Sequence, residues 1–513
     1  MTAPVFIELP ATVHPARVRT ALMARRVPLG WLIAMLVGWL ALDNLLLWQF
    51  LGLTQLWLML PGIALAVLLA GYAKRASERE GPTVAILIAC IAIAGVVLAI
   101  SGEGRFFYAN PDWRLRDALL RDMAVHPWPF AYATPDGVEM LRAPIGMYLL
   151  PAIGGKLWGQ AGGDLLLLAQ NALLDGVLLA LGSTLFTTRG ARLIALACFL
   201  GFSGLDVIGQ LIRGHAALLT PAAHLEPWSV TQYSSTITLF FWVPQHAFAG
   251  WSGALAVMLW RTGKVSARVP AMLFPLLLLW SPLAGMGLLP FILWIGVDSL
   301  IRRKIGRSDF AAVSGALLLA FPALLYLRSG GASVGARLFP INPIHYLLFE
   351  AIEVLPFLLL ASAVAKGRFG VGMFALTSAS LLLIPFGQIG WSIDFAMRAS
   401  IPALMILSLF VAEALSGGVL TPVRRTLLIA CLLLGSATGL AEIARGLTFP
   451  VSPAPHCPLT SQWRDEANFT SASSSYVAPS SALPIALRPA SPWIVPLEPG
   501  CRDAPWPWPA LFH

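Results

Sequence analysis

The sequence predicts an all-α, polytopic membrane protein with about 13 transmembrane helices. Of its 513 residues, 58% are hydrophobic and only 12% are charged, whereas charged residues make up about 25% of an average soluble domain. Its 18 tryptophans also suit membrane interfaces, where Trp is enriched. The composition excludes an ordinary cytosolic enzyme, a disordered chain and a secreted disulfide scaffold.

Thirteen segments are apolar enough to serve as spans, each of which needs roughly 20 residues. They are 27–49, 51–71, 84–101, 164–186, 191–208, 237–260, 269–283, 285–300, 309–327, 344–364, 370–388, 399–416 and 425–445. The apolar stretch 143–158 is shorter and contains Pro144 and Pro151. We expect it to be a re-entrant or interfacial piece.

Lysine and arginine clusters in the short loops predict the orientation. They lie in the N-terminal segment 1–26 and at 74–79, 189–192, 261–268, 302–304, 366–368 and 424–425. With thirteen spans, all of them fall on one side, which the positive-inside bias assigns to the cytoplasm. We therefore expect a cell inner-membrane protein with a cytoplasmic N-terminal segment (1–26), a transmembrane domain (27–445) and an outer, periplasmic C-terminal tail (446–513). Its main outer loops are 102–142 and 209–236.

The outer tail is rich in Pro and Ser and contains Cys457 and Cys501. Because disulfides form in oxidising outer compartments, we expect these two cysteines to be bonded. The other three cysteines, Cys90, Cys198 and Cys431, fall within predicted spans, where Cys acts as a small apolar residue.

The first outer loop runs against the positive-inside bias, because it carries five arginines: Arg105, Arg114, Arg116, Arg121 and Arg142. The guanidinium fork matches phosphate oxygens. Residues 108–123 predict an amphipathic helix in the outer interface, with Asp112 as its N-cap and with Arg114, Asp117 and Arg121 on its polar side. Three structural alternatives stay open: an i,i+4 pair of Asp117 and Arg121, a capping role alone for Asp112, and arginines that contact lipid headgroups.

Further polar residues are predicted on the same outer side. They are His224 and Glu226 in loop 209–236, Arg337, and Arg398, which is spaced i,i+4 from Asp394. His246 lies inside an apolar helix, where an ionisable group is costly and indicates function unless a neighbouring span satisfies it. His224 and Glu226 suit sugar or phosphate contacts as well as a metal, but two such residues make a weak metal signature. We therefore assign no metal site and no certain cofactor, and leave a divalent metal open.

Outer carboxylates, outer arginines and an apolar body together suit a lipid-linked anionic substrate such as a polyprenyl-phosphate sugar. One carboxylate would take the proton from an acceptor hydroxyl as it attacks the anomeric carbon. Arginine would stabilise the departing phosphate. Direct displacement with a single base inverts the anomeric configuration.

The chain resembles GT-C-type integral-membrane glycosyltransferases, which depend on polyprenyl-phosphate sugars. The similar segments are NPDWRLRD (110–117), HLEPW (224–228) and WVPQH (242–246). The chain differs in that its long outer loop follows the third predicted span and not the first. The resemblance implies a catalytic base, Asp112 first and Asp117 second, and five candidate phosphate ligands: Arg114, Arg116, Arg121, Arg337 and Arg398. Together with His224, Glu226 and His246, these arginines are the predicted substrate-binding residues.

The expected partners are a lipid-linked sugar donor, a glycan, lipid or protein acceptor, and membrane lipids. Nucleic acid is not expected, because topology and anion binding account for the net charge of +9. One alternative is an oligosaccharide polymerase or ligase, although such proteins usually place their largest outer loop in the second half of the chain. The other is a transporter or flippase of lipid-linked sugars, for which Asp175 and His246 are the evidence.

Overall fold

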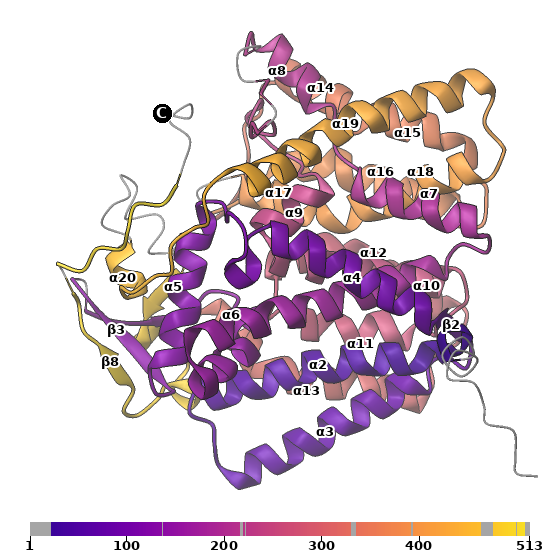
Figure 1. Ribbon diagram of the computed structural model, residues 1–513. Helices are drawn as coiled ribbons and strands as arrows, with labels where there is room; N and C mark the ends of the chain where they lie inside the picture. The colour runs from indigo at the N-terminus through magenta and orange to yellow at the C-terminus, as the bar shows by residue number, and fades with distance from the viewer. Residues whose placement is uncertain are drawn as a thin grey trace, which may run out of the picture.

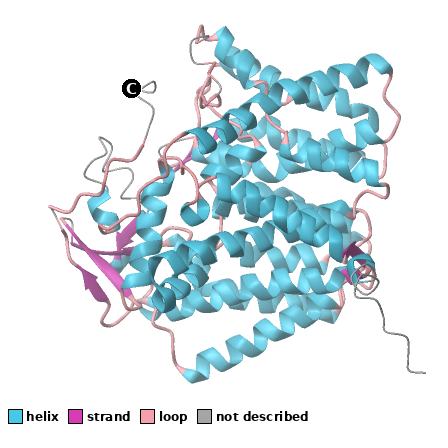
Figure 2. Cartoon of the chain, in the orientation of Figure 1, coloured by secondary structure: helices cyan, strands magenta, loops and turns pink. Residues whose placement is uncertain are grey.

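A computed structural model of the chain describes residues 22–135, 137–215, 219–220, 222–329, 335–390, 393–462, 476–498 and 500–507. Most of the N-terminal segment predicted over 1–26 therefore lies outside the described residues. The described chain is mostly helical, as predicted, with several short strands at the ends of the helices (Figures 1 and 2).

Each of the thirteen predicted segments contains at least one helix. The helices of the first half are α2 (Leu29–Phe50), α3 (Leu56–Lys74), α4 (Val84–Ile100), α5 (Asp112–Val125), α6 (Gly146–Ser183), α7 (Arg189–Leu200), α8 (Asp206–Ile212), α9 (Thr236–Trp242) and α10 (Pro244–Arg261). Those of the second half are α11 (Arg268–Leu277), α12 (Pro282–Ile301), α13 (Arg307–Arg328), α14 (Pro343–Glu353), α15 (Leu355–Ala361), α16 (Val371–Leu383), α17 (Asp394–Ala399), α18 (Ile401–Ser416), α19 (Pro422–Thr448) and α20 (Leu459–Gln462).

Six of the described helices, α2, α3, α6, α12, α13 and α19, are long and apolar enough to cross a membrane. The pair α14 and α15, bent by 51°, makes a seventh if it is one span. Large apolar side chains face outward on several of them, as on α3, where Leu56 and Trp57 are 73% and 72% exposed. Such surfaces suit lipid, because soluble monomers rarely expose large apolar patches. The chain is therefore a membrane protein, while the count of thirteen spans stays a prediction.

Helix α6 is a hairpin and not one straight rod. Its backbone breaks at Gly159 (φ 76°, ψ 178°). The side-chain amide of Gln170 donates a 2.9 Å hydrogen bond to the carbonyl of Met147, and a Cβ atom at Gly163 would lie 3.3 Å from the Cα of Gly155. Residues 146–158 therefore fold back along 160–183. The predicted re-entrant piece is thus a separate helical arm, although its depth in a membrane stays a prediction.

A four-stranded sheet joins the first outer loop to the C-terminal tail, in the order β7-β4-β3-β8. Strands β3 (Phe130–Thr134) and β4 (Gly137–Leu141) come from the loop, whereas β7 (Val477–Pro479) and β8 (Trp493–Val495) come from the tail. The remaining strands form two small pairs, β1 (Arg26–Pro28) with β2 (Glu80–Thr83) and β5 (Ala336–Leu338) with β6 (Gly387–Ile389). The sequence-based prediction included no strands, because segments this short give no local alternation of apolar and polar residues.

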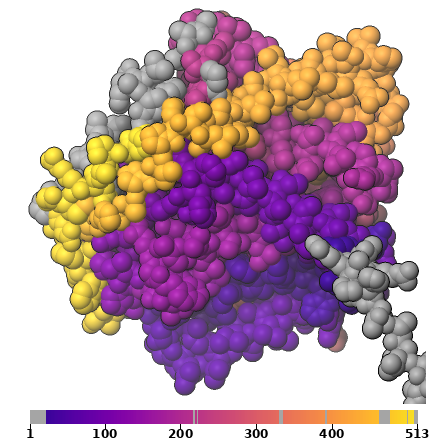
Figure 3. Space-filling view, viewed as in Figure 1, coloured from indigo at the N-terminus to yellow at the C-terminus, as the bar shows by residue number. Residues whose placement is uncertain are grey.

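The tail is tied down in two further ways. Cys457 and Cys501, the two cysteines of the predicted bond, form a disulfide. The backbone N–H of Leu459 donates a 2.8 Å hydrogen bond to the buried carboxylate of Asp122 on α5. The tail therefore covers α5 and the sheet, and Figure 3 shows this yellow segment across one end of the molecule.

The two ends of the helix array differ in chemistry. We call the end with β3, β8, α5 and α20 the sheet end, and the opposite end, at β2, the basic end (Figure 1). At the basic end, burial and the charges of Arg79, Arg368 and Arg192 lower the pKa of Lys264. These four residues come from four of the loops predicted to share one side, and the fold brings all four together.

Candidate functional site

Helix α5 lies inside the protein and not in an exposed interface, which corrects the prediction from sequence. It packs against α6 and α20, and Arg116, Asp117 and Asp122 are buried along with its apolar residues. Asp112 is the first residue of the helix and not its N-cap. The backbone N–H of Asp112 donates a 3.1 Å hydrogen bond to the side-chain oxygen of Asn110.

The break between α9 and α10 positions α5. Pro244 has no N–H to donate, and Val243 leaves the helical conformation (φ −143°, ψ 51°). The carbonyl of Phe241 is free to accept hydrogen bonds from the side chains of Asn110 (2.6 Å) and Trp113 (2.8 Å). The carbonyl of Trp242 accepts one from Arg116. The interrupted helix thus fixes the loop residues that the sequence singles out.

Asp112 and Arg116 form an ion pair at 3.2 Å, with side chains 45% and 3% exposed. Arg116 also donates a hydrogen bond to the hydroxyl of Tyr476 in the tail. Among the described residues, its Nε has no hydrogen-bond partner. A buried guanidinium with one free donor is suited to hold an anion.

Residues from two other helices lie around this pair. Arg398 on α17 is paired with Asp394, and the charges of Arg398 and Arg116 both act on His246 of α10. Burial raises the pKa of Tyr476, which lies among the charges of these same groups. We call Asp112, Arg116, His246, Arg398 and Tyr476 together the arginine site.

His246 does have a partner on a neighbouring helix, as the structural alternative proposed. Its Nδ1 lies 2.8 Å from the hydroxyl of Ser281, which caps α12 by accepting from the backbone N–H of Ala284. The bond fixes the ring orientation of His246 beside the two arginines. A positioned imidazole of this kind is compatible with both a structural and a substrate-contacting role.

Asp117, the second candidate base, is enclosed in an ionic chain. The guanidinium of Arg105 forms ion pairs with both Asp117, at 3.2 Å, and Asp164, at 2.6 Å. Burial raises the pKa of Asp117 to about 7, while the adjacent Arg105 opposes the shift. Asp117 is buried, whereas the side chain of Asp112 is 45% exposed, so of these two carboxylates only Asp112 is open to a second molecule.

Arg121 and Arg337 have partners elsewhere. Arg121 pairs at 2.7 Å with Asp122 and not with Asp117. Asp122 also accepts from the hydroxyl of Tyr132 at 2.9 Å, and burial raises its pKa to about 6. Arg337 is exposed on β5, where it donates to the side chain of Gln388 at 3.0 Å. Arg114 is half-buried on α5.

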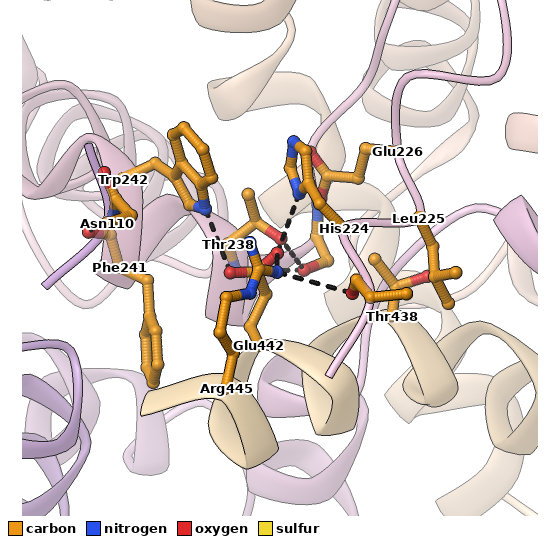
Figure 4. A network of polar contacts seen from close by, with 12 residues as sticks. Asn110, His224, Leu225, Glu226, Thr238, Phe241, Trp242, Thr438, Glu442 and Arg445 are labelled. Carbon is orange, nitrogen blue, oxygen red and sulfur yellow. Dashed lines mark hydrogen bonds and ion pairs between the residues drawn. The ribbon is translucent and has the colours of Figure 1, made fainter. Parts of the chain in front are cut away.

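A second polar cluster, the Glu442 cluster, consists of Glu442, His224, Trp242 and Arg445 (Figure 4). It adjoins the arginine site through Trp242, whose carbonyl accepts a hydrogen bond from Arg116. The carboxylate of Glu442 is hydrogen-bonded to Nδ1 of His224 at 2.8 Å. It also accepts hydrogen bonds from the indole N–H of Trp242 at 2.9 Å and from Arg445. The His224 ring also stacks on Trp242, with 4.6 Å between centroids. Glu442 and Arg445 are not among the residues predicted from the sequence, although two ionisable residues inside a predicted span were a usable signal.

Glu226 lies near this cluster but is occupied by its own loop. It accepts hydrogen bonds from the side chain of Gln232 at 2.5 Å and from the backbone N–H of Ser235 at 2.8 Å. Burial and the neighbouring charge of Asp206 raise the pKa of Glu226 to about 7. Within the described residues, no group of three or more His, Cys, Asp or Glu side chains is arranged to hold a metal ion.

Known proteins give no identification of this chain: no family model, no curated protein and no solved structure matches it. The arginine site and its chemistry are therefore the basis for inferring what the protein does.

Proposed function

We propose that the protein is a GT-C-type membrane glycosyltransferase. It transfers a sugar, with inversion, from a polyprenyl-phosphate donor to a hydroxyl of a glycan, lipid or protein acceptor. One observation carries the proposal: the exposed carboxylate of Asp112 lies 3.2 Å from the buried guanidinium of Arg116. A carboxylate open to an acceptor and a guanidinium held for a phosphate are the two groups that this reaction needs.

Each group has a defined task in the reaction. The acceptor oxygen attacks the anomeric carbon while Asp112 takes the proton of the acceptor hydroxyl. The bond from the anomeric carbon to the phosphate oxygen breaks, and its electron pair leaves with the lipid phosphate. Arg116 and Arg398 stabilise the charge on that phosphate, and His246 and Tyr476 contact the sugar or its phosphate.

The placement of charge supports an orientation for this chemistry. Positive residues from several loops gather at the basic end, as Lys264 and its neighbours show, and the positive-inside bias puts such an end in the cytoplasm. The arginine site and the disulfide-bonded tail then lie on the periplasmic side of the inner membrane. In this arrangement the chain has thirteen spans and a cytoplasmic N-terminus.

Turnover by the purified protein tests the proposal. Proteoliposomes would receive a panel of polyprenyl-phosphate sugars and a mixture of acceptor glycans, and the release of polyprenyl phosphate would be measured. Asp112→Asn should lower the rate by about 10²-fold or more, as expected for loss of a general base. Asp298→Asn is the matched control, because Asp298 on α12 likewise pairs with an arginine four residues along, Arg302, and it should leave the rate unchanged.

Two results would overturn the proposal. One is the absence of lipid-phosphate release with every donor in the panel. The other is full activity of Asp112→Asn. Movement of the intact donor across the bilayer without release would instead identify the flippase alternative.

A further inference from the structure

An apolar groove of about 520 Å³ opens near the basic end and reaches inward to Phe240 and Trp251. Most of its lining comes from α4, α6, α7 and α18, with one residue each from α9 and α10. Helix α4 packs against α6 and helix α7 against α18, and α4 and α7 cross the face turned toward the viewer in Figure 1. Small or apolar side chains such as Ala89, Leu178 and Leu196 form most of the lining.

The length of the groove fits one leaflet of a bilayer. On α4 its lining runs from Ala85 to Ile93, a distance of about 12 Å at 1.5 Å per helical residue. This is less than half of a hydrocarbon core roughly 30 Å thick. The carboxyl group of Asp175 marks the deep end, and its Oδ1 has no hydrogen-bond partner among the described residues. A hydrocarbon chain would therefore extend from the basic end to about the level of Asp175.

Positive charge lies at the open end of the groove. Arg189 and Arg192, at the start of α7, both line it. Arg192 is held in place by hydrogen bonds to the carbonyls of Phe186 (3.0 Å) and Thr187 (3.2 Å). The N-terminus of α7 adds the positive end of its helix dipole.

A polar hollow of about 270 Å³ shares Arg192 with the groove and continues it at the basic end. Lys264 and Arg26 also line this hollow. Glu80, the one acidic side chain among the described residues that line it, is paired with Arg26 at 3.1 Å. The net charge around the open end is therefore positive.

We propose that this groove binds an anionic phospholipid of the leaflet at the basic end. One acyl chain occupies the groove, and the phosphate contacts Arg189 and Arg192. The apolar lining selects a hydrocarbon chain, the two guanidinium groups select a negative headgroup, and the length selects a chain that spans a single leaflet. The site is independent of the proposed glycosyl transfer, because it shares no residue with the arginine site.

Native mass spectrometry of the delipidated protein tests the headgroup preference. Phosphatidylglycerol and phosphatidylcholine with identical chains would be titrated separately. The unaltered protein should bind one phosphatidylglycerol at least about 10-fold more tightly than phosphatidylcholine, since each basic residue near a membrane surface strengthens anionic-lipid binding. The double variant Arg189→Gln/Arg192→Gln should lose this preference. The control Arg424→Gln/Arg425→Gln removes the same charge from exposed positions outside the groove and should keep it.

A second pair of variants tests the acyl-chain pocket. Ala89→Phe fills the groove and leaves both arginines in place, so it should weaken phosphatidylglycerol binding by a similar factor. Ala92→Phe puts the same side chain at an exposed position of α4 that does not line the groove and should bind normally. Equal affinity for the two phospholipids, unchanged binding by Ala89→Phe, or tight binding of polyprenyl phosphate with none of phosphatidylglycerol would overturn the proposal.

Discussion

The carboxylate of Asp112 and the guanidinium of Arg116 are 3.2 Å apart on successive turns of α5, yet only Asp112 reaches the surface. Arg116 is fixed by the carbonyl of Trp242 and the hydroxyl of Tyr476. The pair therefore combines a charge that cannot move with a carboxylate that is open to a second molecule. This difference in exposure separates Asp112 from the other two carboxylates of α5, because Asp117 and Asp122 are both buried.

Tyr476→Phe tests whether the tail contributes to the arginine site. The variant removes one hydroxyl that Arg116 donates to, and a hydrogen bond to a charged group contributes about 1.5–3 kcal/mol. We expect transferase turnover to fall by about 10-fold or more. Tyr346→Phe, which removes a hydroxyl bonded to the carbonyl of Leu382, is the control. Equal rates for the two variants would remove Tyr476 from the site.

Opening the Cys457–Cys501 bond tests how the tail is held. The bond closes a chain segment with a sequence separation of 44 that includes Tyr476 and β7, and such a cross-link contributes about 2–4 kcal/mol. Cys457→Ser/Cys501→Ser should increase proteolysis of the tail and lower transferase turnover. Cys431→Ser, which removes a free thiol, should do neither. Turnover that survives intact while the tail is cleaved would show that the tail is not required.

Asp117→Asn links stability to pH. The folded-state pKa of Asp117 is about 7, above the value of about 3.9 for a free Asp side chain. The folded state therefore binds more protons between about pH 4 and 7, so this residue makes stability fall as pH rises through that window. Melting temperature measured against pH should decline less steeply in Asp117→Asn than in the unaltered protein. A steeper decline would contradict the sign of the shift, and retained transferase activity would support Asp112 as the base.

Glu442→Gln tests the Glu442 cluster as a buried network. Arg445 is 1% exposed, and Glu442 is its ion-pair partner among the described residues. Removing one member of a buried pair costs about 3–5 kcal/mol, because the other charge loses its partner. Thermal unfolding should show a large loss of stability, and the double variant Glu442→Gln/Arg445→Met should recover part of it. Additive losses in the double variant would show that the two residues are not coupled.

The sequence predicted where helices form better than where they pack. Segment 108–123 reads as a helix with an outward polar face, and α5 is indeed helical there. Three of its polar residues, Arg116, Asp117 and Asp122, are nevertheless buried. The tail folds back over the loop and supplies partners such as the N–H of Leu459. Packing between segments more than 300 residues apart leaves no local pattern in either segment.

The same limit explains which site residues were found. Asp112, Arg116, His246 and Arg398 are detectable because ionisable residues are rare in this chain and these lie in predicted outer loops or inside an apolar segment. Tyr476 gives no such signal, since it lies in a Pro- and Ser-rich tail. Glu442 and Arg445 were missed even though ionisable residues in a span are informative.

Gly159→Ala tests the hairpin that the prolines of 143–158 only suggested. The backbone of Gly159 (φ 76°, ψ 178°) lies in a region that is essentially restricted to glycine, and forcing another residue into it costs about 1–3 kcal/mol. The turn brings Met147 beside Gln170, so the strain should loosen the arm that α5 packs against. We expect a lower melting temperature for Gly159→Ala.

Gly190→Ala is the matched control, because Gly190 has no atom within 4 Å of an added Cβ and lies within helix α7. It should be neutral or slightly stabilising, since alanine favours helices over glycine. Equal melting temperatures for the two variants would mean that residues 146–183 do not need the glycine-specific turn to fold back.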